Sequence, residues 1–482
     1  IKREALQGAP FFVRIIERFF SGRFTMEFIA REETGKELLL ESLENKTLPR
    51  APWVPFAGVH AGKLKGYTAR EVLTDGEKLV QSLLEVNRLY RPDGQPVVFD
   101  LQLEAEALGC DLVWSDVNPP SVSGHPLKKD REIHGLLPDE SSGRIPLVLE
   151  AMREMKRKVG RHTALFGLVC GPLTLASHLR GTDFFMDIIE EPQYAQDLLS
   201  YTSDVCNRMA GMYIEAGMDV IAFVDPMVSQ ISPRHFKRYL SGPFSGLFAS
   251  VRQNGAKSSF FVCGDATKNI EAMCQTGPDS LFVDENIDLV SAKEITDSYG
   301  VVIGGNIPLT TTMLYGNQKD NMKYVIELLE RLGTRNYIVA PGCDMPYDVP
   351  VENGIAIQQA VRDVERVKAI LENYETTEEG IEIDLPDYEH LEKPLIEVFT
   401  LDSATCAACT YMMSVARLAL EEFKDRVDVV EYKFTVRENI HRIKKMGVKN
   451  LPSIYINGRL KYSSIIPDRR EFFSEIEKLL SS

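Results

Sequence analysis

The feature that most constrains the fold is a regular alternation of short apolar runs and longer amphipathic segments between residues 53 and 372. Eight of the runs have the length and composition of buried strands. They are Val54–Val59, Val97–Phe99, Leu165–Val169, Asp219–Val224, Ser259–Val262, Ser280–Val283, Val301–Gly304 and Tyr337–Ala340. Because strands that alternate with helices form parallel sheets, eight repeats predict an α/β fold of the (β/α)8 TIM-barrel type.

Polar side chains or thiols follow nearly every one of these runs. They are His60, Asp100, Cys170, Asp225, Cys263, Asp284 with Glu285, Asn306 and Cys343. In a barrel the carboxyl ends of the strands share one face, where the loops build the active site, so the pattern predicts a reactive mouth. Coincidence is the alternative, because loops are commonly polar.

Two kinds of role are predicted for the polar residues at the strand ends. Asp100 and Asp225 are interpreted as catalytic acid–base groups. His60, Asp284 and Asn306 are interpreted as substrate contacts. Loop capping and salt bridging are the alternative roles for the aspartates.

The two cysteines at strand ends form the most specific part of this pattern. The apolar run Ser258–Gly264 delivers Cys263, and the run Asn336–Cys343 delivers Cys343. Thiols at the ends of parallel strands of one barrel converge, which is how a soft-metal or thiolate site is built from distant sequence.

Charge and hydropathy exclude two classes of protein. The net charge of −15, from 55 basic and 70 acidic residues, argues against a nucleic-acid partner. The chain has no apolar run long enough for a membrane span and no signal-peptide core, which predicts a cytoplasmic protein.

The phenylalanines and isoleucines of residues 11–20 predict a helical extension that packs on the main domain or on a second subunit, as in a homodimer. A membrane-surface helix is the alternative.

A second pattern begins after an acidic linker at residues 373–393, so we divide the chain into a domain of residues 1–372 and a domain of residues 394–482. The second domain reads strand, Cys406-Ala407-Ala408-Cys409, helix, strand, helix and a strand that enters an Asn457-Gly458 turn. A single C-x-x-C between a strand and a helix indicates redox chemistry rather than a zinc ribbon. The helix dipole favours Cys406 as the attacking thiolate, with Cys409 as the resolving thiol.

This second domain resembles thioredoxin and glutaredoxin-like proteins, and Leu451-Pro452 is similar to their cis-proline. It departs from thioredoxin in having Ala407-Ala408 in place of Gly-Pro. The resemblance implies a dithiol/disulfide function, whose target is a barrel thiol, an oxidised cobalt or a thiol acceptor. A retained fold used for docking is the alternative.

Three segments of the first domain resemble the uroporphyrinogen decarboxylase superfamily over about residues 30–370. They are Phe99–Gly109, Gly171–Ala176 and Phe282–Asp288. Where the decarboxylases have Arg-Gln-Ala-Gly-Arg, this chain has Val59–Lys63, which lacks both guanidinium groups and disfavours a porphyrinogen substrate.

The cobamide-dependent methyltransferase branch has a His-x-Cys at one strand end and a Cys at a later one, which together hold Zn²⁺. Cys263 and Cys343 match these cysteines, but the histidine position holds Phe261. The resemblance implies zinc bound by Cys263, Glu285 and Cys343, with an open position for substrate. A metal-free barrel whose cysteines serve redox chemistry or packing is the alternative.

The function implied by the resemblance is methyl transfer between a corrinoid protein and a small-molecule donor or thiol acceptor, in either direction. The zinc would activate a thiol or improve a leaving group. The corrinoid is expected on a separate protein, because an Asp-x-His-x-x-Gly cobalamin signature is absent. The alternatives are a tetrapyrrole decarboxylase and a non-catalytic corrinoid- or tetrapyrrole-binding protein with a redox arm.

Overall fold

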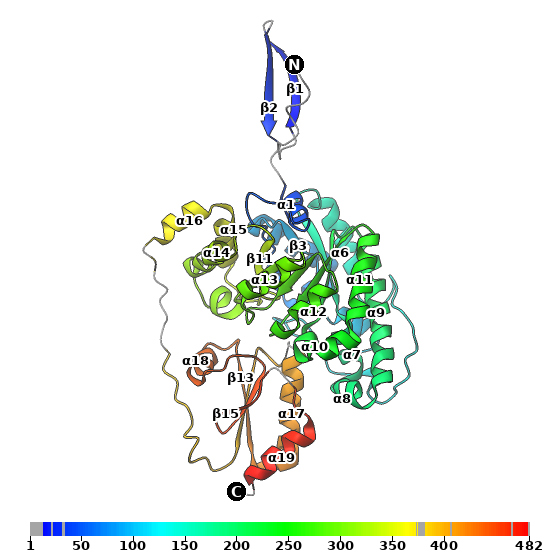
Figure 1. Ribbon diagram of the computed structural model, residues 1–482, viewed down its shortest axis with the longest axis vertical. Coiled ribbons are helices and arrows are strands. Elements are labelled where there is room, and N and C mark those ends of the chain that lie inside the picture. Colours follow the sequence, from blue (N-terminus) through cyan, green and yellow to red (C-terminus); the bar gives the residue numbers. More distant parts are fainter. Residues whose placement is uncertain are drawn as a thin grey trace.

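A parallel sheet curled into a barrel forms the centre of the computed structural model, which describes residues 13–20, 23–30, 34–372, 374, 381–404, 407–463 and 466–480 (Figure 1). Its seven strands pair in the order β11-β10-β9-β8-β7-β6-β3. They are β3 (Gly94–Pro96), β6 (Ala164–Cys170), β7 (Val220–Val224), β8 (Lys257–Val262), β9 (Ser280–Val283), β10 (Val302–Ile307) and β11 (Tyr337–Pro341). Six of the eight predicted strands are confirmed with small shifts of their ends.

The other two predicted strands need correction. Residues 52–54 form only a short bridge, in which Val54 N–H donates to Val339 O at 3.0 Å and Asp93 N–H donates to Trp53 O at 2.9 Å. This segment therefore connects the two edge strands and gives a TIM-barrel-like closure. Pro52 and Pro55 have no N–H to donate, which explains why no full strand forms here. The second strand, β3, lies just before the predicted Val97–Phe99.

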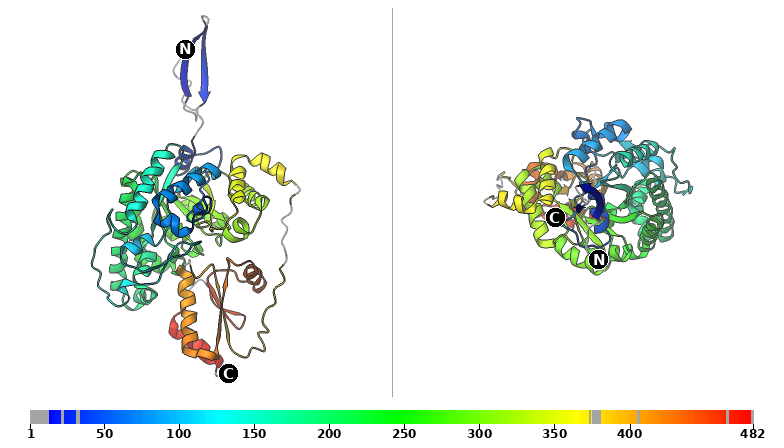
Figure 2. Two further views of the ribbon diagram at one scale, coloured as in Figure 1. Left: turned by 180° about the vertical axis from the view of Figure 1, so that it is seen from behind. Right: turned by 90° about the horizontal axis from the view of Figure 1, so that it is seen from above.

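Helices surround the barrel (Figure 2). They are α1 (Gly35–Ser42), α2 (His60–Lys63), α3 (Ala69–Thr74), α4 (Gly76–Tyr90), α5 (Leu103–Ala107), α6 (Ile145–Lys158), α7 (Pro172–Arg180), α8 (Asp183–Glu190), α9 (Pro192–Glu215), α10 (Pro233–Tyr239), α11 (Ser241–Gln253), α12 (Ile270–Gln275), α13 (Leu289–Ser298), α14 (Gln318–Leu332), α15 (Val351–Arg362) and α16 (Val364–Leu371). Short strands β4 (Leu112–Val113) and β5 (Ser121–Val122) pair beside them, and a short helical turn, η2 (Pro226–Gln230), follows β7. Within the described residues, none of the helices combines the length and apolar character that a membrane crossing needs.

An aromatic cluster fills the barrel interior. The Phe56 ring lies 4.7 Å from the Phe261 ring and 5.0 Å from the Phe282 ring, and it also contacts Phe99 and Phe166. Side chains alternate along each strand, so every second residue faces this interior while the others pack under the helices. The partly buried Cys263 and Cys343 pack against the same cluster.

The N-terminal segment forms a β-hairpin where the sequence predicts a helix. Strands β1 (Val13–Phe20) and β2 (Arg23–Ala30) are antiparallel, with Val13 opposite Ala30. The missed signal is the alternation of Phe24, Met26 and Phe28 with other residues, which is a strand pattern, together with the β-branched and aromatic residues of β1. Phe11 and Phe12 lie outside the described residues.

The C-terminal domain has a mixed sheet in the order β13-β12-β14-β15. Its elements are β12 (Leu395–Thr400), α17 (Ala407–Phe423), β13 (Asp428–Lys433), α18 (Arg437–Met446), β14 (Ser453–Ile456), β15 (Arg459–Ser463) and α19 (Arg469–Leu480). Helices α17 and α19 pack on one face of the sheet and α18 on the other. Asn457 and Gly458 have positive φ angles of 49° and 70°, as the predicted hairpin turn requires.

The C-terminal domain lies against one end of the barrel, away from α1, in both views (Figures 1 and 2). Tyr411 of α17 donates its hydroxyl hydrogen to Ser177 O at 3.0 Å, and its ring contacts the Phe185 ring. A second contact joins Tyr315 of the barrel to Thr435 O. The C-terminal domain is therefore docked on the barrel through specific side chains.

Candidate active site

A cavity of about 210 Å³ lies at the carboxyl ends of the barrel strands. Cys263, Cys343, Asp284, Glu285 and Asp344 belong to its barrel wall. The C-terminal domain closes it from the other side with Leu401, Asp402 and Thr435. Among the described residues, neither a lysine nor an arginine lines this cavity, and most of the exposed lining is apolar.

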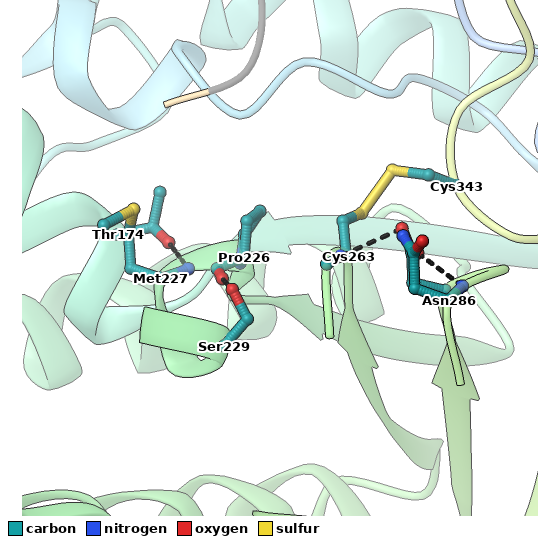
Figure 3. Close-up of a disulfide and its surroundings, with 9 residues drawn as sticks. Thr174, Pro226, Met227, Ser229, Cys263, Asn286 and Cys343 are labelled. Atoms are coloured by element: carbon teal, nitrogen blue, oxygen red, sulfur yellow. Dashed lines mark hydrogen bonds between the residues drawn. A yellow bond between two sulfur atoms is a disulfide. The ribbon is translucent and has the colours of Figure 1, made fainter. Parts of the chain in front are cut away.

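The two predicted thiols meet at this mouth. Cys263 follows β8 and Cys343 follows β11, which are separated by β9 and β10 in the sheet. Their sulfur atoms are joined as a disulfide, with the Cα atoms 6.0 Å apart (Figure 3). The barrel therefore brings together two residues that are 80 positions apart in the sequence.

Glycines beside the two cysteines permit this approach. Gly264 has a φ of +84°, a left-handed conformation that favours glycine. A Cβ atom at Gly342 would lie 2.8 Å from Glu285 N, so a larger residue there would push the Cys343 loop away from β9. The cysteine positions thus depend on the adjacent Cys-Gly and Gly-Cys pairs.

Two adjacent carboxyl groups stand beside the thiols. Asp284 accepts hydrogen bonds from Gly264 N–H and Asn286 N–H, both at 2.9 Å, and Glu285 accepts one from Leu309 N–H. Burial raises the pKa of Asp284, and burial with the neighbouring Asp284 charge raises the pKa of Glu285 to about 8. Glu285 is therefore mainly protonated at neutral pH and able to exchange a proton near that pH.

The donor set of Cys263, Glu285 and Cys343 has the right chemistry for zinc, because zinc takes thiolates and carboxylates and a catalytic site leaves one position open. In this structure the three groups have other partners. The two sulfur atoms are bonded to each other, and Glu285 accepts a hydrogen bond from Leu309 N–H. Among the described residues there is no group of three His, Cys, Asp or Glu side chains placed to hold a metal. A zinc centre would therefore require the reduced thiols.

Asp225 and Asp100 serve structural contacts in this structure. The Asp225 carboxylate accepts hydrogen bonds from Leu173 N–H, Thr174 N–H and the Thr174 hydroxyl at the start of α7. Burial raises its pKa to about 7, although these hydrogen bonds act in the opposite direction. Asp100 pairs with Arg144 at 2.7 Å. Neither aspartate lines the cavity, although Thr174, which Asp225 holds, does.

His60 and Asn306 also lie behind the cavity wall. The two ring nitrogens of His60 contact Tyr90 Oη at 2.7 Å and Tyr347 O at 3.0 Å, and burial lowers its pKa to about 4. Asn306 donates hydrogen bonds to Asp284 O at 3.0 Å and Ile287 O at 2.8 Å. Asn306 thus positions the Asp284–Glu285 loop, and His60 anchors α2 to α4.

Some cavity residues were not predicted. Asp344 directly follows Cys343, so the same strand end could have predicted its place in the cavity. Burial raises the pKa of Asp344 well above the usual value for aspartate. Thr174 and His178 lie on α7, and burial lowers the pKa of His178 to about 3, so its ring is uncharged. The lining residues of the C-terminal domain had no sequence signal, because no local pattern encodes how two domains dock.

The predicted dithiol is described only in part. Cys406 lies outside the described residues. Cys409, in the first turn of α17, is buried, and its Sγ accepts a hydrogen bond from Leu401 N–H at 3.3 Å. Because Leu401 lines the cavity, this contact connects the C-x-x-C segment to the cavity wall.

Glu104 lies in the segment Phe99–Gly109. Its buried carboxyl group should make the stability of the fold depend on pH. Its side chain is fully buried, with Oε1 accepting from Cys170 N–H at 3.2 Å, and burial raises its pKa to about 8. The folded protein thus binds the Glu104 proton more tightly than the unfolded chain does. The stability that comes from this bound proton is complete below about pH 4.5, and it is lost as the pH rises to about 8.

We expect Glu104→Gln to remove this loss. Relative to the wild type, the unfolding free energy of the variant should rise by up to about 1.4 kcal/mol per pH unit across that window. Urea denaturation between pH 5 and pH 8 measures the difference, with Glu215→Gln on the exposed side of α9 as the control. Parallel stability curves for wild type and Glu104→Gln would contradict the assignment.

Comparison with known proteins identifies the family. The family model described as uroporphyrinogen decarboxylase (URO-D) matches residues 34–364, which is more than half of the chain. The chain therefore belongs to the URO-D family, and the match ends before the C-terminal domain.

Within this family, similarity extends to methyltransferases and decarboxylases. The methylcobamide:CoM methyltransferase MtbA of Methanosarcina acetivorans is 26% identical over 329 residues, which cover 67% of this chain and 96% of that protein. MtaA of Methanosarcina barkeri, of the same description, is 28% identical over 341 residues, covering 69% and 98%. A uroporphyrinogen decarboxylase of Trichodesmium erythraeum is 23% identical over 293 residues, covering 59% and 81%. The solved structure of a methyltransferase from Methanosarcina mazei matches with a TM-score of 0.64 and 27% identity, covering 69% of this chain and 99% of that one.

Proposed function

We propose that the barrel transfers a methyl group between the corrinoid of a partner protein and a small thiol or methyl donor bound in the cavity. The observation that carries this proposal is the convergence of Cys263 and Cys343 at the barrel mouth, beside Glu285. The similarity to methylcobamide:CoM methyltransferases supports it.

The side chains at the barrel mouth have separate roles in this proposal. In the reduced protein, Cys263, Cys343 and Glu285 would hold zinc, whose contribution when bound would be to lower the pKa of a coordinated substrate thiol. Glu285 would bind the metal as a carboxylate, so the proton that burial retains in the metal-free protein would be released when zinc binds. The apolar lining of the cavity excludes water from the reacting sulfur.

A porphyrinogen decarboxylase is the second candidate, and the cavity argues against it. Porphyrinogen carboxylates need cationic partners, but Lys63 bonds to Asp348 at 2.8 Å and does not line the cavity. The carboxyl groups of Asp284, Glu285 and Asp344 line it instead. A bound polycarboxylate would therefore meet like charge or protonated acids rather than guanidinium groups.

We further propose that the C-terminal domain is a thioredoxin-like dithiol domain in which Cys406 attacks and Cys409 resolves. The order β12-α17-β13-α18-β14-β15-α19 and the position of Cys409 at the start of α17 support this proposal. The helix N-terminus would favour the thiolate of Cys406.

Methyl transfer is tested with the full-length protein, reduced by a phosphine and supplied with zinc. Methylcobalamin serves as the methylated corrinoid and a panel of small thiols as acceptors. We expect the methyl–cobalt absorbance to fall while an equal amount of methylated thiol forms. Release of CO₂ from uroporphyrinogen would instead identify a decarboxylase, and corrinoid binding without turnover would identify a binding protein.

A further inference from the structure

Residues that follow β12 in the C-terminal domain line the same cavity as the barrel cysteines. The loop that connects β12 to α17 contributes Leu401 and Asp402 to the cavity that Cys263 and Cys343 also line. The same loop leads into the C-x-x-C, and Leu401 N–H donates to Cys409 Sγ at 3.3 Å. Leu401, which contacts Cys409, and the cysteine pair of the barrel therefore line one cavity.

Specific contacts hold the domain in this orientation. Helix α17 packs against η2, whose first residue, Pro226, lines the same cavity as Cys263. The buried Tyr411 hydroxyl donates to Ser177 O at 3.0 Å. The contact between Tyr315 and Thr435 fixes the opposite side of the domain. The docked position is thus defined at three separate points around the mouth.

From this arrangement we infer that the Cys263–Cys343 disulfide of the barrel is the substrate of the Cys406/Cys409 dithiol in the same chain. This inference rests on the dithiol role proposed for the C-terminal domain. It selects one target from those that the sequence left open, because the barrel pair is oxidised and lies in the cavity that Leu401 and Asp402, between β12 and the C-x-x-C, also line.

The exchange balances without an unnamed reactant. The Cys406 thiolate attacks one barrel sulfur, a bond forms between them, and the other barrel sulfur leaves as a thiolate. The Cys409 thiolate then attacks Cys406 Sγ, which releases the second barrel thiolate and leaves a Cys406–Cys409 disulfide. Two electrons have moved to the barrel, and an external small dithiol reduces the C-terminal disulfide for the next round. The consequence is a barrel pair returned to the thiol form that methyl transfer requires.

Trapping the intermediate tests this inference directly. In full-length Cys409→Ser/Cys343→Ser, and separately in Cys409→Ser/Cys263→Ser, both thiols that could break the mixed disulfide are absent, so it should persist after the reduced variant is oxidised with one equivalent of an oxidised small dithiol. Non-reducing peptide mapping by mass spectrometry should find Cys406 joined to Cys263 or Cys343. Finding Cys406 only as a thiol, or joined only to the small dithiol, would overturn the inference.

A rate measurement tests it independently of trapping. We expect a small dithiol to reduce the barrel disulfide at least about tenfold more slowly in Cys406→Ser/Cys409→Ser than in the wild type, because the intramolecular thiol acts at a high effective concentration. Equal rates would overturn the inference. Cys274→Ala, which removes a buried cysteine of α12, should react like the wild type. Tyr411→Phe should slow the exchange, because it removes only the docking hydrogen bond to Ser177.

Methyl transfer measured on phosphine-reduced protein separates this inference from the proposed barrel function. If methyl transfer is observed but neither the mixed disulfide nor the slower disulfide reduction is found, the inference alone fails. A mixed disulfide without transfer means that the methyltransferase proposal alone fails and that the exchange serves another reaction at the mouth.

Discussion

Replacing Cys343 by alanine is expected to lower methyl transfer by more than about 100-fold in protein kept reduced. The reason is that Cys263 and Cys343 supply the cysteine sulfur atoms of the described cavity wall, and both belong to the proposed ligand set. Loss of a residue that merely supports a metal ligand typically costs 10–100-fold, so loss of a direct ligand should exceed this range. Initial rates with methylcobalamin and a small thiol measure the effect, and metal analysis of the same samples should show loss of zinc.

Two controls distinguish a chemical role from a structural one. Cys274→Ala removes another thiol without touching the cavity and should retain full activity. Urea denaturation under reducing conditions should show similar stability for Cys343→Ala and reduced wild type, because neither then has the disulfide. Wild-type activity in folded Cys343→Ala would refute the proposed role of the cysteine pair.

The positions of the reactive residues were more predictable than their partners. The end of a strand places Cys263, Asp284, Glu285 and Cys343 at the mouth. Period-two alternation turns Cys263, like Phe261, toward the barrel axis, whereas Cys343 lies two residues beyond the end of β11. His60 sits at an equivalent sequence position but lies in a helix, because the segment before it forms a short bridge rather than a strand.

What the sequence did not reveal depends on contacts between distant segments. Asp100 and Asp225 are committed to Arg144 and to the start of α7, partners that no local pattern indicates. The disulfide required knowing the separation of β8 and β11 across the mouth. The docking of Leu401 and Asp402 over the cavity depends on the surface fit of two domains.

Phe261→His should lower the stability of the metal-free protein, and added zinc should reverse much of that loss. Phe261 faces the barrel interior, with its ring 4.7 Å from the Phe56 ring. An imidazole there loses aromatic packing and has no polar partner, so metal-free Phe261→His should be about 2–4 kcal/mol less stable than the wild type. Residues 261 and 263 face the same side of β8, so the new nitrogen points toward the side of Cys263. Zinc added to the reduced variant should therefore restore much of the lost unfolding free energy.

Phe261→Leu provides the matched control, because it loses the ring but introduces no ligand. Urea denaturation of the reduced proteins, with and without zinc, compares the three chains. If zinc stabilises Phe261→His more than it stabilises both wild type and Phe261→Leu, the metal binds between β8 and β11, and the phenylalanine has replaced a ligand at an otherwise retained centre. An equal effect of zinc on all three would place any bound zinc away from position 261. The Cys263–Cys343 pair would then be better explained by thiol–disulfide chemistry alone.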